Sequence, residues 1–218
     1  MESHVFYRRF GRVHPTVERG EGVYLYDADG KRYLDASGGP VVVNIGHGVA
    51  EIVQAMAEQA GRVAYAHASM FTTQALEDYA DALAEIVPLP HPRFFFLSSG
   101  SEAVETAIKF ARQVQIDRGE TGRYIVISRW RSYHGTTLGA LAVSGRPYFR
   151  HPYLPLLRDV PHIPPPYCYR CTWGKSYPAC DMDCARALEE AVKLTGPENV
   201  AAFFAEPITG ASLGAAMP

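Results

Sequence analysis

The stretch that decides the fold reads Leu97-Ser98-Ser99-Gly100-Ser101-Glu102-Ala103 and joins an apolar run to a helical pattern. Ser99 and Glu102 have the spacing of a capping box, which predicts a helix that begins at Gly100. The first N–H groups of such a helix have no partner within it, and the helix dipole adds partial positive charge there. Glycine lets an anion approach the backbone, and serine hydroxyls add donors. The turn therefore predicts either a phosphate site or an ordinary capped helix, and by itself it names no cofactor.

The segments on both sides alternate between strand and helix patterns, which favours an α/β fold with a largely parallel sheet. Continuous apolar runs predict buried strands at 94–97, 124–127 and 200–205. Apolar residues at helical spacing predict helices at 50–62, 74–87, 100–117, 135–143 and 185–194. Residues 22–35 predict a hairpin around Asp29-Gly30, and the proline-rich residues 152–166 predict an extended surface excursion.

Length and charge narrow the class of protein. The chain has 218 residues, 47% of them hydrophobic and 20% charged, which is typical of soluble globular proteins. Its formal net charge of −2 gives no reason to expect nucleic acid or an anionic membrane as partner. No apolar run approaches the roughly 20 residues that a bilayer requires, and the first residues lack the pattern of a secretion signal. We expect a cytoplasmic protein.

An ordered set of stretches carries a family resemblance. The set comprises residues 22–35, Asn44-Ile45-Gly46-His47-Gly48, Ser98 to Ala103 with Lys109 to Arg112 after it, Tyr133-His134-Gly135, and Ala205-Glu206-Pro207-Ile208. In this order the stretches resemble the class III aminotransferases, the group of ornithine, 4-aminobutyrate and ω-amino-acid aminotransferases. The resemblance covers about residues 20 to 218. It implies pyridoxal 5'-phosphate as cofactor.

The resemblance also implies an architecture. It is that of a fold-type I pyridoxal-phosphate-dependent transferase, an α/β fold, here with an incomplete, mostly parallel sheet, flanking helices and a small N-terminal segment. Residues 1–50 would form the N-terminal hairpin segment of the small domain. Residues 51–218 would form the front part of the large cofactor-binding domain, which is truncated.

The cofactor-binding set that the resemblance implies is Ser99, Gly100, Ser101, Tyr133, His134 and Glu206. Gly100 and Ser101 match the pair whose amides hold the cofactor phosphate, and Tyr133 matches the aromatic residue that stacks on the pyridine ring. Stacking of this kind contributes on the order of 1 kcal/mol beyond area burial. Sites in parallel sheets gather at the carboxyl ends of strands, where Glu206 is expected.

Structural alternatives stay open for single members of this set. Tyr133 is also compatible with a core aromatic residue, and Glu206 with a hydrogen-bonded strand terminus. His134 fits a turn-stabilising residue better than an acid or base. His47 is a further candidate, for the substrate entrance.

The catalytic groups of the family are expected outside this sequence. The aspartate that pairs with the pyridinium nitrogen and the lysine that forms the Schiff base both follow the Glu-Pro-Ile stretch in the family. Residues 207–218 contain neither Asp nor Lys, so the Schiff-base lysine is expected beyond Pro218 and no catalytic residue is assigned here. We expect a fragment that does not transaminate by itself. A natural split protein or a degraded enzyme would give the same pattern.

The intact enzyme is expected to pass an amino group from an amino donor to a keto acid or aldehyde, as a homodimer. A decarboxylase, a racemase or an aminomutase would share these motifs, and a non-catalytic cofactor- or zinc-binding module is the alternative from another class. Many family members follow the glutamate with a second glutamate that gates the substrate. Thr209, Gly210 and Ala211 stand here instead, which leaves the substrate class open.

Four cysteines fall within one short segment, at Cys168, Cys171, Cys180 and Cys184. Two close thiolate pairs suit tetrahedral zinc, although the short gap between the pairs is not a standard finger spacing. Reduced cysteines in an inserted loop, or disulfides, are the alternatives, and the cytosol disfavours disulfides. The expectation from sequence is a loop without metal.

Overall fold

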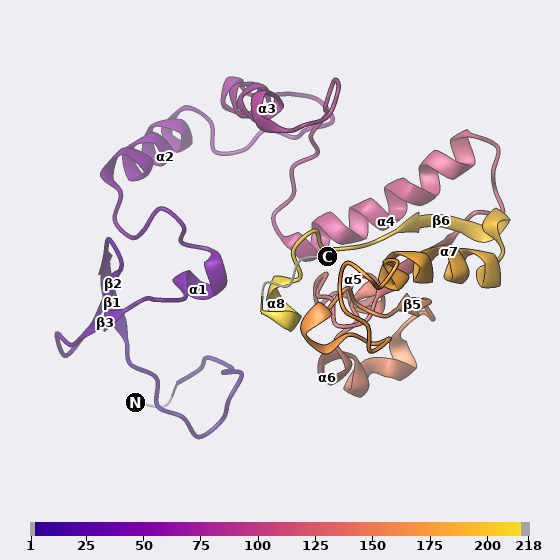
Figure 1. The fold of residues 1–218 in the computed structure, drawn as a ribbon. Coiled ribbons are helices and arrows are strands. Elements are labelled where there is room, and N and C mark those ends of the chain that lie inside the picture. The colour runs from indigo at the N-terminus through magenta and orange to yellow at the C-terminus, as the bar shows by residue number, and fades with distance from the viewer. Residues whose placement is uncertain (1–2, 215–218) are drawn as a thin grey trace. The chain divides into compact units, whose positions relative to one another are not determined.

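The structure is a computed structural model that describes residues 3–214 (Figure 1). The chain divides into two compact units, Met1–Phe94 and Phe95–Pro218, and each unit is described by itself. The domain boundary expected near residue 50 stays a prediction, because compactness does not assign a segment to a domain of the intact enzyme.

The first unit contains a small antiparallel sheet in the order β1-β2-β3. Its strands are β1 (Val17–Glu21), β2 (Tyr24–Asp27) and β3 (Arg32–Leu34). The predicted hairpin is confirmed, and the buried Asp27 holds its turn by accepting hydrogen bonds from the Tyr33 hydroxyl at 2.6 Å and the Lys31 N–H at 2.9 Å. β1 was not predicted, since its sequence VERGE has no alternating apolar residues.

Three helices follow in the same unit: α1 (Gly38–Val41), α2 (Ala50–Arg62) and α3 (Gln74–Ile86). The helices predicted at 50–62 and 74–87 are confirmed. Thr73 caps α3 by accepting the Leu76 N–H at 3.3 Å.

The second unit contains a parallel sheet in the order β5-β4-β6. Its strands are β4 (Ile125–Arg129), β5 (His162–Ile163) and β6 (Val200–Phe203). The strands predicted at 124–127 and 200–205 are confirmed, with observed bounds of Ile125–Arg129 and Val200–Phe203. The strand predicted at 94–97 is wrong, because this run forms no strand in the structure and both edges of β4 are taken by β5 and β6.

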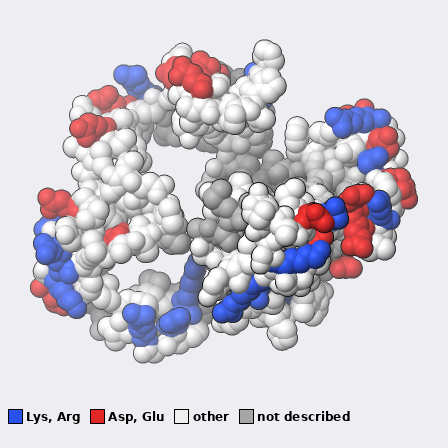
Figure 2. Space-filling view, viewed as in Figure 1, with Lys and Arg blue, Asp and Glu red and all other residues white. Residues whose placement is uncertain are grey.

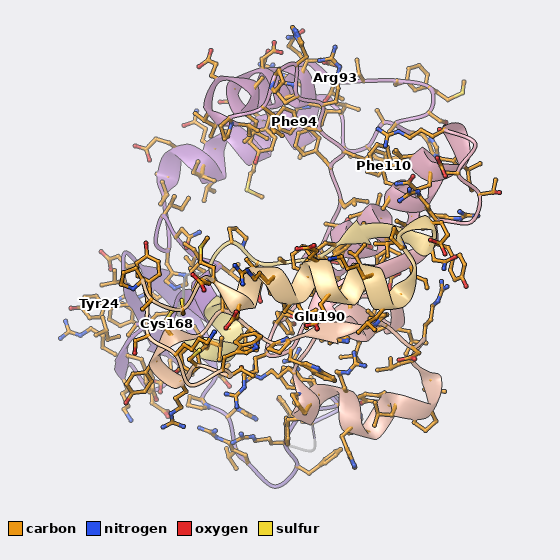
Figure 3. The ribbon with its side chains drawn as sticks, turned by 45° about the vertical axis from the view of Figure 1, so that its right-hand side comes forward. Tyr24, Arg93, Phe94, Phe110, Cys168 and Glu190 are labelled. Atoms are coloured by element: carbon orange, nitrogen blue, oxygen red, sulfur yellow. The ribbon has the colours of Figure 1, made fainter. Side chains whose placement is uncertain are left out.

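Helices cover this sheet, and Figures 1 and 3 show α4 (Gly100–Asp117) and α7 (Asp183–Thr195) on opposite sides of β6. The shorter helices are α5 (Leu138–Val143), α6 (Pro147–Arg150) and α8 (Gly210–Leu213), and the 3-10 turns are η1 (His151–Leu156), η2 (Cys168–Arg170) and η3 (Pro197–Asn199). The extended excursion predicted at 152–166 is wrong in part, because η1 and β5 fall within it.

The buried hydrophobic core of the described residues lies in β4, α5 and the segment that ends at β5. Its members are Val126, Ile127, Ala140, Leu141, Ala142, Val143, Val160 and Ile163. The buried Arg150 fixes the end of α5, because its guanidinium donates to the carbonyls of Leu141 at 3.0 Å and Ser144 at 2.8 Å, and also to that of Ala142. A cation at a helix C-terminus also complements the helix dipole. α5 is therefore a fixed element beside the sheet.

The surface carries charges of both signs. On the face that Figure 2 draws, blue and red side chains are interspersed around white regions. Within residues 3–214, no helix combines the length and apolar character needed to cross a bilayer.

Candidate cofactor site

The N-terminus of α4 is capped but still open to a ligand. The Ser99 Oγ accepts the Glu102 N–H at 3.2 Å, which confirms the predicted cap, and the Ala103 N–H donates to the Ser99 carbonyl at 3.0 Å. Among the described residues, the N–H groups of Gly100 and Ser101 have no protein acceptor. Beyond its own helix and chain neighbours, no heavy atom lies within 4 Å of where a Cβ on Gly100 would stand. Two helix-start donors are therefore left without an acceptor among the described residues.

The turn from Tyr133 to Gly135 lies against this helix start. The Thr136 N–H donates to the Ser101 Oγ at 3.0 Å, which joins the turn to α4. Gly135 has a φ of +135°, and a Cβ there would lie 2.9 Å from the Ala140 Cβ and 3.0 Å from the Ser101 Cα. Only glycine therefore allows the turn to come this close to α4.

His134 is held by the buried side of the turn. Its N–H donates to the Ser144 Oγ at 2.8 Å, its Nε2 lies 3.4 Å from the Ser128 Oγ, and its ring meets Phe204 edge-on. Burial, and secondarily the charge of His162, lower the pKa of His134 to about 4. The imidazole is therefore neutral at pH 7, which supports a turn-stabilising role over an acid–base one.

Glu206 follows β6 and reaches the same turn from the sheet. Its carboxylate accepts the Tyr133 N–H at 3.1 Å, while the Tyr133 ring packs edge-on against Phe149 with centroids 6.0 Å apart. Burial raises the pKa of Glu206, and the hydrogen bond from Tyr133 offsets part of this effect. The glutamate therefore positions the backbone of Tyr133, and its own contact with a cofactor stays a prediction.

One open pocket gathers most of the predicted set, and we call it the α4 pocket. Its lining consists of Ser99, Gly100, Ser101, Val104, Tyr133, His134 and Gly135. Of the predicted cofactor residues, all but Glu206 line it, and Glu206 bonds to one of its members. Sequence reasoning missed Val104, although its place one turn after Gly100 on the same helix face is a usable signal.

The groups that support this pocket from behind could not be predicted from the sequence. The carboxylate of Glu105 accepts the N–H groups of Gly139 at 2.8 Å and Ala140 at 3.1 Å, at the start of α5. Burial raises the pKa of Glu105, but hydrogen bonds from Thr137 and these two amides outweigh burial, so the pKa is lowered overall. Nothing in the spacing of two distant segments predicts such a contact.

The remaining candidates lie elsewhere. In the first unit, the His47 Nε2 lies 2.9 Å from the Asp35 Oδ2, and a role for His47 at a substrate entrance stays a prediction. None of the chain's lysines lines the α4 pocket. They are Lys31, Lys109, Lys175 and Lys193.

The same fold and motifs occur in known proteins. A family model described as aminotransferase class-III matches residues 6–217. The chain belongs to the class III aminotransferase family. Over its full length it is 38% identical to the uncharacterized aminotransferase YodT of Bacillus subtilis (strain 168), of which it covers 49%. It is 34% identical to a leucine/methionine racemase of Thermococcus litoralis, with 96% of the chain and 48% of that protein covered.

Solved structures of this family agree on the fold. The whole chain matches 51% of an amine transaminase from an uncultivated Pseudomonas species in its PLP-bound form, with a TM-score of 0.90 and 34% identity. The chain therefore has the α/β fold of the fold-type I pyridoxal-phosphate transaminases. It spans about half the length of these class III relatives.

Proposed function

We propose that this chain binds pyridoxal 5'-phosphate in the α4 pocket, with the phosphate on the N–H groups of Gly100 and Ser101. The observation that carries the proposal is that these two donors lack acceptors among the described residues and belong to residues that line one pocket with Tyr133. A phosphate dianion suits such a helix start, because it accepts several hydrogen bonds and its charge complements the helix dipole.

Each neighbouring group would have a distinct task. The Ser99 hydroxyl keeps the helix start in place through its bond to the Glu102 N–H. Tyr133 would stack on the pyridine ring, and Glu206 and Ser101 hold the two ends of its turn. His134 stays neutral and fixes the turn from behind. When bound, pyridoxal phosphate supplies the electron sink for chemistry on an amino group.

The reaction that we propose for the intact enzyme is transfer of an amino group from an amino donor to a keto acid or aldehyde. We further propose a cytoplasmic homodimer. Because none of the four lysines lines the α4 pocket, we propose that the 218-residue chain does not transaminate by itself.

Racemisation is the second candidate, and the similarity to a leucine/methionine racemase favours it specifically. The two reactions differ in their co-substrate. A transaminase needs a keto acid or aldehyde to complete its cycle, whereas a racemase converts one enantiomer of an amino acid into the other without an acceptor. Chiral analysis of an active preparation with and without acceptor separates them.

The binding proposal is tested by comparing pyridoxal phosphate with pyridoxal in equilibrium dialysis. Pyridoxal should bind on the order of 100-fold more weakly, because it lacks the group that accepts charge-assisted hydrogen bonds from the helix. Tyr133→Ala should weaken both ligands by roughly 3- to 10-fold, because stacking does not depend on the phosphate. Tyr133→Phe keeps the ring and is the matched control.

Two results would overturn the proposal. Equal affinity for the two ligands would remove the phosphate from the α4 pocket. Borohydride trapping of the cofactor on a single lysine of this chain, in one-to-one ratio, would contradict the expected lack of transamination.

A further inference from the structure

The loop that carries the four cysteines has no core of its own. From residue 167 to residue 184 no side chain is buried, although each of these residues has a described conformation. The side chains that are less exposed than the rest are Tyr167, Cys171, Trp173, Cys180, Asp183 and Cys184. Half of this inward-facing set is therefore cysteine, in a segment that hydrophobic burial does not stabilise.

All four cysteines line one pocket, together with Trp173, Lys175 and Tyr177 among others. Cys168 begins the 3-10 turn η2, Cys171 follows that turn, and Cys184 lies in the first turn of α7. Figure 3 labels Cys168 in this loop and Glu190 on α7. All four are free thiols. The two cysteine pairs, which are neighbours in the sequence, thus line the same pocket in the folded chain.

A second observation concerns a buried donor near Cys184. The Nε of Arg129, at the end of β4, is a buried donor that has no partner within the described residues. Burial lowers the pKa of the Arg129 guanidinium, and the charge of the nearby Cys184 offsets part of this effect.

We propose that Cys168, Cys171, Cys180 and Cys184 bind one zinc ion as thiolates and so stabilise this loop. Four sulfur ligands match the tetrahedral preference of zinc, and a closed set of four is typical of structural sites. Each thiol gives its proton to solvent as its Zn–S bond forms. Zinc with four thiolates has a net charge of −2, which the guanidinium of Arg129 partly balances, whereas Lys175 is already paired with Asp183.

Binding requires the cysteine side chains to rearrange. In their present conformations, no three His, Cys, Asp or Glu side chains of the described residues are arranged to hold a metal ion. The freedom available to each sulfur is rotation about the Cα–Cβ bond between staggered wells. The Lys175–Asp183 ion pair at 2.6 Å already ties the loop to the start of α7.

Elemental analysis of the purified protein tests the proposal. We expect about one zinc ion per chain, and after exchange we expect the Co²⁺ form to show the absorption of tetrahedral thiolate ligation. The double variant Cys168→Ser/Cys184→Ser should retain less than about a tenth of the zinc. Tyr169→Phe, which changes an exposed side chain between two ligands, is the matched control and should keep it.

Arg129→Gln tests separately whether the positive charge of Arg129 supports zinc binding by the thiolates. It removes the guanidinium while all four thiols remain, and should weaken zinc binding by about 10-fold or more, as changes to groups that support ligands do. Circular dichroism checks that each variant is folded.

Three results would overturn the zinc site. One is wild-type protein without zinc whose four thiols react at once with a thiol reagent. Another is a pair of disulfides in the freshly purified protein. The third is iron in place of zinc. None of them bears on cofactor binding, which is measured with a different ligand at a different pocket.

Discussion

The starts of α4 and α5 lie side by side, joined by the bond from Thr136 to Ser101, and differ in how their N–H groups are satisfied. At α5 the chain provides its own anion, because the Glu105 carboxylate accepts the N–H groups of Gly139 and Ala140. At α4 the N–H groups of Gly100 and Ser101 have no acceptor among the described residues.

This difference separates a structural helix start from a binding one. Helix starts carry the same unpaired donors and the same sign of dipole, whatever their sequence. At the start of α5, the Glu105 carboxylate accepts the N–H groups and fixes the helix to the core. At the start of α4 the N–H groups have no such acceptor, and an external anion of the right size can bind there. The two helix starts therefore differ in whether a side chain of the chain itself accepts their N–H groups.

The largest loss of stability is expected when the Glu105 carboxylate is removed from the start of α5. Glu105→Ala removes two charge-assisted hydrogen bonds and leaves two partly buried N–H groups unpaired, which should lower the free energy of unfolding by about 3 kcal/mol. Glu105→Gln keeps one acceptor and should cost less than half as much. Denaturant titration measures both. Equal stability of Glu105→Ala and wild type would mean that the carboxylate does not hold α5.

Placing a carboxylate at the start of α4 should strongly weaken the binding of an anionic ligand there. Gly100→Asp places a carboxylate among the free N–H groups and should weaken pyridoxal phosphate binding on the order of 100-fold by charge repulsion. Stability should be unchanged or slightly higher, since the added side chain has free space and suits the helix dipole. Gly100→Ala adds the Cβ without the charge and should bind nearly as wild type does. Unaltered affinity in Gly100→Asp would place the phosphate elsewhere.

The turn between the two starts should make stability depend on pH. The pKa of His134 is about 4 in the folded chain, against 6.5 for a free histidine. Between these values the unfolded chain binds more protons, so stability should fall as the pH is lowered from 6.5 to 4. The loss should be about 1 to 2 kcal/mol after allowance for residual solvent exposure.

His134→Gln should flatten that part of the profile. The pKa of His162 is also lowered, chiefly by burial, so a slope should remain in the variant. The difference between the wild-type and variant curves, from urea titrations at each pH, therefore isolates His134. Parallel curves would contradict the buried, neutral imidazole.

The smallest effect concerns the link between the two starts. Ser101→Ala removes the acceptor of the Thr136 N–H and should cost about 1 kcal/mol of unfolding free energy. Ser212→Ala, which removes a hydroxyl that has no hydrogen-bond partner among residues 3–214, is the control and should cost less. A loss in Ser101→Ala no greater than in the control would show that the link does not stabilise the fold.

Sequence reasoning succeeded where the cause is local. The start of α4 at Gly100 was predicted to the residue, because the bond between Ser99 and Glu102 spans one turn. The run at 94–97 was read as a strand from its apolar side chains, but strand formation depends on a partner that such a run does not specify.

The same division holds for the site. The sequence motifs predicted most of the residues that line the α4 pocket. The contacts of Glu105 and Arg150 could not be predicted, because they join segments that come together only in the folded chain. The convergence of the four cysteines on one pocket was likewise beyond the reach of their spacing.

The central claim is that the N–H groups of Gly100 and Ser101 hold the cofactor phosphate. Amide NMR of the ¹⁵N-labelled protein, titrated with pyridoxal phosphate and then with inorganic phosphate, tests it directly. We expect the Gly100 and Ser101 signals to move with both ligands, and to move further than those of Gly139 and Ala140, whose N–H groups already donate to Glu105. Saturable binding that leaves the Gly100 and Ser101 signals in place would contradict it.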